Sequence, residues 1–177
     1  MKSGANGAGI YYQNQEASST NDEGFLVEGC LFDGCEGSNG QALFINKIKA
    51  SVQLKSNLFW NHVHGKFIAT IMYDGTVPET IIEDCYFEHN IFNQDHVSGG
   101  GSGLWITSGK DIPIDVTLLA TTFRNNTAKG NGGGFAAGSI SGSYNSVNFE
   151  FNECVFINNT AGLHGGAIYL NNHLVKF

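Results

Sequence analysis

The chain has 177 residues, of which 41% are hydrophobic and 14% charged, and its formal net charge is −7. An acidic chain without a basic face argues against a nucleic-acid partner, because phosphate binding needs positive charge. The abundance of Phe and aliphatic residues excludes collagen and disordered linkers, and the longest apolar runs are too short to predict a membrane span. The N-terminus, MKSGANGAGIYY, lacks the apolar region of a secretory signal peptide, so neither a signal nor an anchor is expected in this chain.

A strand–bend–strand unit built around a Phe recurs five times along the chain. Seven and five residues before each Phe the residues are apolar or β-branched, and this spacing of two is typical of a strand with one buried face. The inward-facing positions change from odd to even offsets about three residues before each Phe, which predicts a bend there between two short strands. The Phe residues are Phe32, Phe59, Phe87, Phe123 and Phe156, and the bend residues are Gly29, Ser56, Asp84, Ala120 and Glu153.

Each Phe is followed by a further column and then by a Gly-rich segment that leads into an apolar strand. The Gly segments alternate strictly with the Phe units and suit tight corners, where glycine accepts positive φ. Their alignment places Ala69 with Phe44 and Trp105. The Gly segments are residues 7–11, 40–44, 65–69, 101–105, 132–136 and 165–169, and the column three residues after the Phe contains Cys35, His62, Asn90, Asn126 and Asn159.

Repeats of this length predict a solenoid, in which each coil buries its inner face only by stacking on its neighbours. Strands of successive coils are expected to pair about 4.8 Å apart, so that Phe stacks on Phe and Asn on Asn. Opposite charges in neighbouring copies favour the same register, as for Glu88 and Arg124. We expect one all-β domain over residues 1–177, a parallel β-helix of about five to six coils with uncapped ends that is a fragment of a longer solenoid. The alternative is a β-sandwich with turn-rich loops.

Two kinds of motif resemble the repeats of polymorphic outer membrane proteins, which read FxxN and GGA[ILV]. They are FEHN (87–90), FRNN (123–126) and FINN (156–159), paired with GGGF (132–135) and GGAI (165–168). The resemblance covers nearly the whole chain and implies a right-handed parallel β-helix of the pectin-lyase-like type. It also implies an adhesin-like role at the cell surface or in the extracellular space. The first two copies depart from the motif, because Cys35 and His62 replace the Asn.

The cysteines and histidines do not predict a metal site or a cofactor. Cys30, Cys85 and Cys154 share the column two residues before the Phe and are expected to be small core residues. Alternate coils lie too far apart for a disulfide, and the chain contains no CxxC pair. His62 and His64 have a spacing that can bind a metal, but no third ligand follows from the spacing.

Carboxylate pairs bear on whether the chain is an enzyme. Glycoside hydrolysis needs two carboxyl groups about 5–10 Å apart, and β-helix lyases and hydrolases cluster such groups on an outer face. Candidate pairs are Glu83 with Asp84 and Asp111 with Asp115, but no carboxylate neighbours Asp84 in its own column. The NTD, DD, GHG and RIK signatures of polygalacturonases are also absent. We therefore expect no catalysis, and a polysaccharide lyase or glycoside hydrolase is the alternative.

Function is expected on the outer faces and corner loops, because the inner columns serve stacking. Trp60 lies in an outward column and is the candidate contact residue for a partner, whereas Trp105 is expected to pack in the core. The sequons at Asn125 and Asn158 are candidate N-glycosylation sites, each one residue before a stacked Asn. The expected partner is a host-cell protein or glycan, or other copies or segments of the same solenoid.

Overall fold

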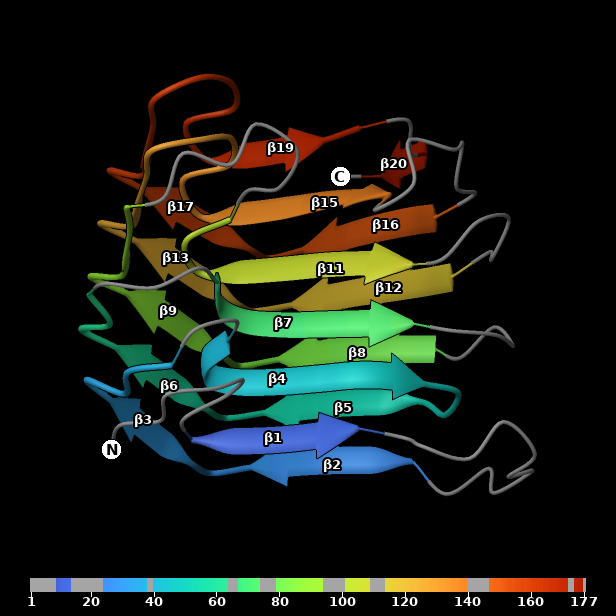
Figure 1. Ribbon diagram of the computed structural model, residues 1–177. Helices are drawn as coiled ribbons and strands as arrows, with labels where there is room; N and C mark the ends of the chain where they lie inside the picture. Colours follow the sequence, from blue (N-terminus) through green and yellow to red (C-terminus); the bar gives the residue numbers. More distant parts are fainter. Residues whose placement is uncertain are drawn as a thin grey trace.

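The computed structural model describes residues 9–13, 24–37, 40–63, 67–73, 79–93, 101–108, 114–139, 147–171 and 174–176. Within these ranges the regular structure is β-strand without helix, and the strands form four sheets in which neighbouring strands are parallel. Strands from the same position of successive repeats lie side by side, so successive repeats add neighbouring strands to the same sheets (Figure 1). The all-β class and the parallel stacking predicted from the repeats are confirmed.

The four sheets are a front, a back, a side and a short sheet. The front sheet faces the viewer in Figure 1 and contains β1 (Ile10–Gln13), β4 (Gly40–Ile48), β7 (Phe67–Tyr73), β11 (Leu104–Ser108), β15 (Phe135–Ser139) and β19 (Ile168–Leu170). The back sheet contains β2 (Phe25–Glu28), β5 (Val52–Lys55), β8 (Glu79–Glu83), β12 (Ile114–Leu119), β16 (Val147–Asn152) and β20 (Leu174–Lys176). The side sheet contains β3 (Leu31–Asp33), β6 (Leu58–Trp60), β9 (Tyr86–Glu88), β13 (Thr122–Arg124) and β17 (Val155–Ile157). The short sheet contains β10 (Ile91–Phe92), β14 (Thr127–Ala128) and β18 (Thr160–Ala161).

The front, back and side sheets enclose one hydrophobic core. Leu104 of β11, Leu118 of β12 and Phe123 of β13 have no exposed surface and belong to the same cluster of buried residues. β12 and β13 alternate buried and more exposed residues, as a strand with one inward face must. The core therefore runs along the whole stack, and each coil contributes one layer to it.

The five Phe of the repeat form a column through the side sheet. Adjacent rings are stacked, with centroids 4.6 to 4.9 Å apart and interplanar angles of 1 to 6°. This separation matches the spacing of about 4.8 Å that backbone pairing imposes on neighbouring strands. Phe59, Phe87 and Phe123 are fully buried, whereas Phe156 at the end of the column is half-buried.

Two corners of left-handed residues bound the side sheet in every coil. The bend expected three residues before each Phe is confirmed, since the φ values there lie between 47° and 62°. A second corner two residues after the Phe has φ values between 52° and 56°. Glycine, Asn and Asp accept this conformation best, but several corner residues are of other types. The first corner consists of Gly29, Ser56, Asp84, Ala120 and Glu153, and the second of Gly34, Asn61, His89, Asn125 and Asn158.

The alignment of the front sheet differs from the sequence prediction in one coil. Ala69 pairs with Leu43 and Leu104, not with Phe44 and Trp105, so it faces the core. The register of β4 and β7 shifts between Gly40 and Leu43, where β4 holds one more residue than its partner. The displacement is the same against β11, whose register with β7 is regular. Thr70, the partner of Phe44 and Trp105, follows Gly65 by five residues, whereas the other two follow their Gly by four, so an alignment on the Gly residues moves this strand by one position.

Candidate functional site

A ladder of amide side chains lines the inside of the second corner. The Oδ1 atom of Asn126 accepts hydrogen bonds from the backbone N (3.2 Å) and the Nδ2 (3.0 Å) of Asn90. Asn159 accepts the same two bonds from Asn126, at 3.1 and 3.0 Å. Each ladder Nδ2 also donates to the carbonyl of the Phe one coil earlier, as from Asn126 to Phe87 at 2.7 Å. Asn90 and Asn126 thus each join three coils and Asn159 joins two, which gives the Asn column a structural role.

His62 continues this ladder in the second coil. Its backbone N donates to Asn90 Oδ1 at 3.2 Å, and its ring Nδ1 lies 2.9 Å from the same oxygen, so the proton is placed on Nδ1. The ring is fully buried, and burial lowers the pKa of His62. Its Nε2 has no hydrogen-bond partner in the described part of the chain.

A second, shorter ladder lies at the first corner, in the column that contains the cysteines. Asn57 accepts a bond from the Cys30 backbone N (2.9 Å) and donates to the Val27 carbonyl (2.8 Å). Sequence reasoning treated this column only as small residues, although an Asn between two Cys was a signal for a polar link. The four cysteines are free thiols, and burial raises the pKa of Cys85 to about 11, which keeps it protonated and unreactive.

The outer face of the side sheet carries a column of five side chains, four of them apolar. These residues lie in register one position before the Phe, and three of them have exposed fractions between 42 and 66%. They are Leu31, Leu58, Tyr86, Thr122 and Val155, and we call this column the apolar strip. Ile157, on the same strand as Val155, adds a further exposed side chain. Leu58 and Thr122 are half-buried, so the exposed apolar residues alternate with less exposed ones along the column. Exposed apolar residues gathered on one face, as opposed to scattered ones, mark interaction surfaces.

Polar and aromatic side chains border the apolar strip in the outward column one residue after the Phe. Arg124 Nη2 lies 2.6 Å from Glu88 Oε1, so the ion pair predicted from the repeat is present. Trp60 is half-buried, and its ring meets the His89 ring edge-on at 4.6 Å between centroids. The structure thus places the sequence-predicted Trp60 beside the apolar strip, with part of its surface exposed.

The described carboxylates singled out from the sequence make links between coils. Glu83 lies 3.8 Å from Lys55 Nζ, Asp84 accepts from Ser56 Oγ at 3.2 Å, and Asp115 accepts from Asn148 Nδ2 at 2.7 Å. Asp111 and His64 lie outside the described residues. The register also places Glu79 directly beside Asp115 on the outer face of the back sheet, and both are exposed. Sequence reasoning missed this pair, because the loop before each of these strands differs in length.

The two sequon asparagines occupy the second corner, but their surroundings differ. Asn125 is half-buried, and its Nδ2 lies 3.3 Å from His89 Nε2. Asn158 is exposed. An N-glycan needs free access to the side-chain nitrogen, so Asn158 is the better placed of the two.

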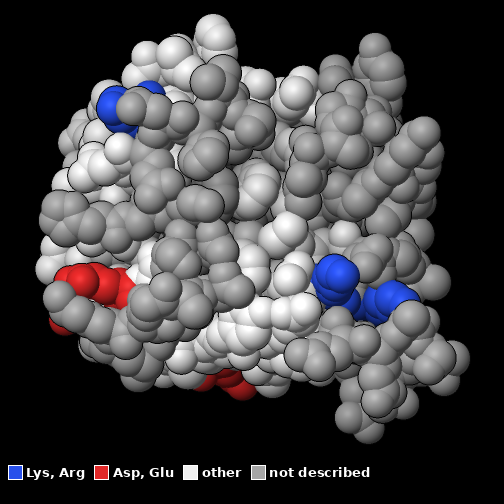
Figure 2. All heavy atoms as spheres, in the orientation of Figure 1, with Lys and Arg blue, Asp and Glu red and all other residues white. Residues whose placement is uncertain are grey.

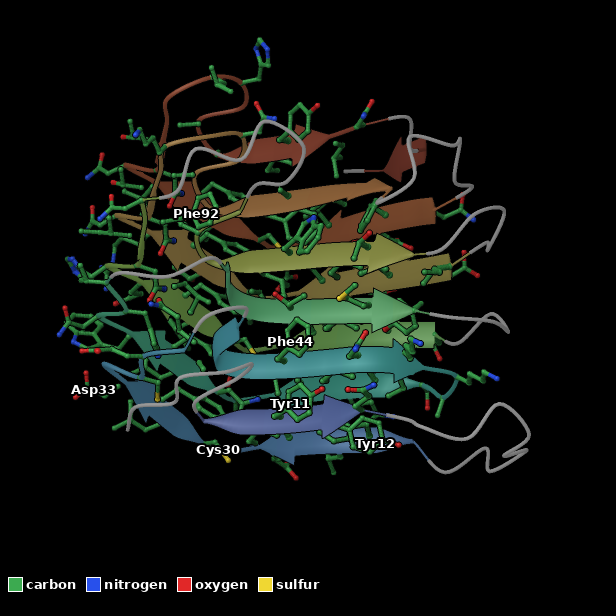
Figure 3. All side chains as sticks on the ribbon, viewed as in Figure 1. Tyr11, Tyr12, Cys30, Asp33, Phe44 and Phe92 are labelled. Atoms are coloured by element: carbon green, nitrogen blue, oxygen red, sulfur yellow. The ribbon has the colours of Figure 1, made fainter. Side chains whose placement is uncertain are left out.

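Aromatic residues also lie on the outside of the front sheet. Tyr11 stacks on Phe44 with centroids 5.6 Å apart and an angle of 5° (Figure 3). Trp105, expected in the core, packs instead in a small second cluster with Phe92 and Ala128. This cluster joins the front sheet to the short sheet.

Charged side chains do not gather into one patch in the view of Figure 2, where small groups of each sign lie apart among the described residues. The described residues contain no group of three or more His, Cys, Asp or Glu arranged to hold a metal ion. None of their elements is a helix long and apolar enough to cross a membrane. Comparisons with models of protein families, with curated proteins and with solved structures found no match for this chain.

Proposed function

We propose that the chain is a surface-exposed, adhesin-like or structural β-solenoid without catalysis, which contacts its partner through the outer face of the side sheet. We also infer that it is a right-handed, pectin-lyase-like β-helix of about five to six coils, located at the cell surface or outside the cell. The observation that carries the proposal is the apolar strip, with Leu31 exposed to 66% and Tyr86 and Val155 to 42% each.

The rigidity of the strip supports a role in binding. Its strands lie between two left-handed corners, and their inward side chains are held in the Phe column and the Asn ladder. Five positions at about 4.8 Å give the strip a length of roughly 19 Å without loop movement. A surface that is already ordered loses little conformational entropy when it binds.

The chemistry of the strip suits a host-cell protein or glycan. Tyr86 and Trp60 offer aromatic surface together with a polar group, a combination enriched at protein interfaces. The net charge of −7 disfavours nucleic acid as a partner. If the role is structural, the partner is another copy or segment of the same solenoid, and its stack of coils buries the apolar strip.

Binding of the labelled chain to cultured host cells tests the proposal. We expect a double variant, Leu31→Ser with Tyr86→Ser, to bind at least tenfold more weakly, because both changes remove exposed apolar area without touching the core. Tyr11→Ser is the matched control, since Tyr11 is exposed to 43% but lies on the front sheet. Treating the cells with glycosidases or with protease then distinguishes a glycan from a protein. Equal binding by the double variant and the wild type would refute the role of the strip.

Location is tested separately, on intact cells of the source organism. An antibody against the chain is expected to label unpermeabilised cells, and brief protease treatment of whole cells is expected to remove the label. Labelling that needs permeabilisation would contradict the surface location but not the strip as a binding face.

A second candidate, a polysaccharide hydrolase or lyase, is favoured by the Glu79–Asp115 pair. Two exposed carboxylates on adjacent strands lie at about the separation that retaining glycosidases use. Incubation with a panel of acidic polysaccharides tests this. Chain cleavage that disappears in Asp115→Asn would replace the adhesin-like proposal, and intact polymers would remove the enzyme alternative for that panel.

A further inference from the structure

The Asn ladder begins with two residues of a different kind. Cys35 and His62 occupy the positions that Asn90, Asn126 and Asn159 occupy in later coils. Both side chains are buried, with exposed fractions of 6 and 0%. A thiol next to an imidazole is not needed for stacking, since an Asn at both positions would extend the ladder. The pair therefore calls for its own explanation.

The orientation of the His62 ring follows from its bond to the next coil. Nδ1 donates to Asn90 Oδ1 at 2.9 Å, which leaves Nε2 with a free lone pair. The two nitrogens of an imidazole point away from each other, so Nε2 faces away from Asn90 and towards the preceding coil. It is buried there without a hydrogen-bond partner among the described residues. A buried acceptor without a partner is costly, and a ligand would satisfy it.

Cys35 is the residue that the register of the stack places next to His62 in the preceding coil. β3 and β6 pair with Phe32 opposite Phe59, and the same register three residues further places Cys35 opposite His62. The Cys35 Sγ lies 3.9 Å from the carbonyl oxygen of Asp33, which is only a weak contact.

We propose that Cys35 Sγ and His62 Nε2 form a two-coordinate site for a soft monovalent cation, for which Cu(I) is the model ion. On binding, the Cys35 thiol releases its proton to solvent, the thiolate sulfur bonds to the ion, and Nε2 donates its lone pair to the opposite side. The ion is neither oxidised nor reduced. This proposal is independent of the adhesin-like function, because the site lies inside the second corner and not on the apolar strip.

Geometry and charge both favour a linear monovalent ion. Metal–sulfur and metal–nitrogen bonds of about 2.3 and 2.0 Å place the two ligand atoms roughly 4.3 Å apart across a linear ion, near the strand spacing of about 4.8 Å. One thiolate neutralises one positive charge, so the occupied site has no net charge in its buried position. A divalent zinc ion would keep a positive charge and needs four ligands, and the described residues offer no group of three.

The ligand types agree with this choice. Thiolate sulfur selects soft ions such as Cu(I), and imidazole binds copper as well. Without the ion both groups are neutral at pH 7, because burial lowers the pKa of His62 and raises that of Cys35. The ion therefore displaces one proton, and its affinity is expected to rise with pH.

Anaerobic titration with Cu(I) in competition with a coloured Cu(I) chelator tests the proposal. The reference protein carries Cys30→Ser and Cys154→Ser, which removes the two half-exposed thiols. We expect one equivalent of Cu(I) to bind to this reference and binding to be lost in Cys35→Ser. His62→Asn is the decisive variant, because it installs the ladder's own residue, keeps the fold, and is expected to weaken binding at least tenfold.

Thermal unfolding supplies a second readout that does not depend on the chelator. Cu(I) is expected to raise the melting temperature of the reference protein and to leave that of His62→Asn unchanged, because a ligand stabilises only the state that binds it. Cu(I) binding by His62→Asn with the affinity of the reference would overturn the proposal. So would the absence of any stoichiometric binding to a folded reference protein.

Discussion

At the scale of single residues, each buried amide of the Asn ladder makes several hydrogen bonds, and their loss is expected to destabilise the fold. Asn126 is fully buried and takes part in bonds to Asn90, Asn159 and the Phe87 carbonyl. We predict that Asn126→Ala lowers the free energy of unfolding by about 3 kcal/mol or more, because each buried group left without a partner costs about 1–3 kcal/mol. Urea denaturation followed by circular dichroism measures this loss.

The matched control for this prediction is Asn159→Ala. Asn159 makes the same bonds to the preceding coil but is half-buried, so water can replace part of what is lost. Its effect is expected to be less than half that of Asn126→Ala. Equal losses at the two positions would mean that burial does not determine the strength of the ladder.

The residue scale also shows what the sequence can and cannot predict. The Asn column was apparent because each Asn follows a Phe by the same three residues. The link made by Asn57 was missed, because that column alternates Asn and Thr with Cys and has no repeated polar type. The free Nε2 of His62 follows from which ring nitrogen meets Asn90, and a sequence pattern does not contain ring orientations.

At the scale of elements, the corners of the side sheet hold ordinary residues in a conformation that disfavours them. Ala120 has a φ of 47°, and its backbone N donates to the Asn152 carbonyl at 2.9 Å. A non-glycine residue in this region costs about 1–2 kcal/mol, and glycine avoids that cost but loses about 0.5–1 kcal/mol of backbone entropy. We predict that Ala120→Gly raises the free energy of unfolding by about 0.5–1 kcal/mol in urea denaturation.

Gly29 provides the reverse substitution at the same corner. It has a φ of 62°, and a Cβ added there meets no atom within 4 Å. Gly29→Ala is therefore expected to destabilise the chain by about 1 kcal/mol through backbone strain alone. If Ala120→Gly also destabilises the chain, the corner at Ala120 contributes no strain that glycine relieves, whatever the result at Gly29.

Fixed spacing explains which elements were predictable. The two corner residues are five positions apart in every coil, so the side sheet and the bend were aligned from the Phe alone. The front sheet follows loops of varying length, and Gly65 lies one residue further from its strand than Gly40 and Gly101 lie from theirs, which is why Ala69 was misplaced by one position. The pairing of Glu79 with Asp115 was missed for a similar reason. Both residues lie at the start of strands that follow loops of different length, so no fixed spacing aligns them in the sequence.

At the scale of the whole molecule, each coil contacts mainly the coils on either side of it. Strands pair within a sheet only with the equivalent strands of adjacent repeats, so stability is a sum of neighbouring contacts. The Phe column illustrates the consequence, because Phe87 stacks on two rings at 4.6 and 4.8 Å whereas Phe156 stacks on one at 4.9 Å. Substitutions at Phe87 and Phe156 should therefore differ both in how much stability they cost and in how many coils they affect.

We predict that Phe87→Ala destabilises the chain by about 3–5 kcal/mol, because it leaves a cavity at a fully buried position. It is expected to increase amide hydrogen exchange along the stack, since the coils on both sides lose a contact. Phe156→Ala is expected to cost less, because its ring is half-buried, and to increase exchange mainly in β16 and β17. Hydrogen exchange of the 177-residue chain, read by mass spectrometry of its peptides, measures both effects. Uniform loss of protection in Phe156→Ala would mean that the stack unfolds as a single unit, and that its stability is not a sum of contacts between neighbouring coils.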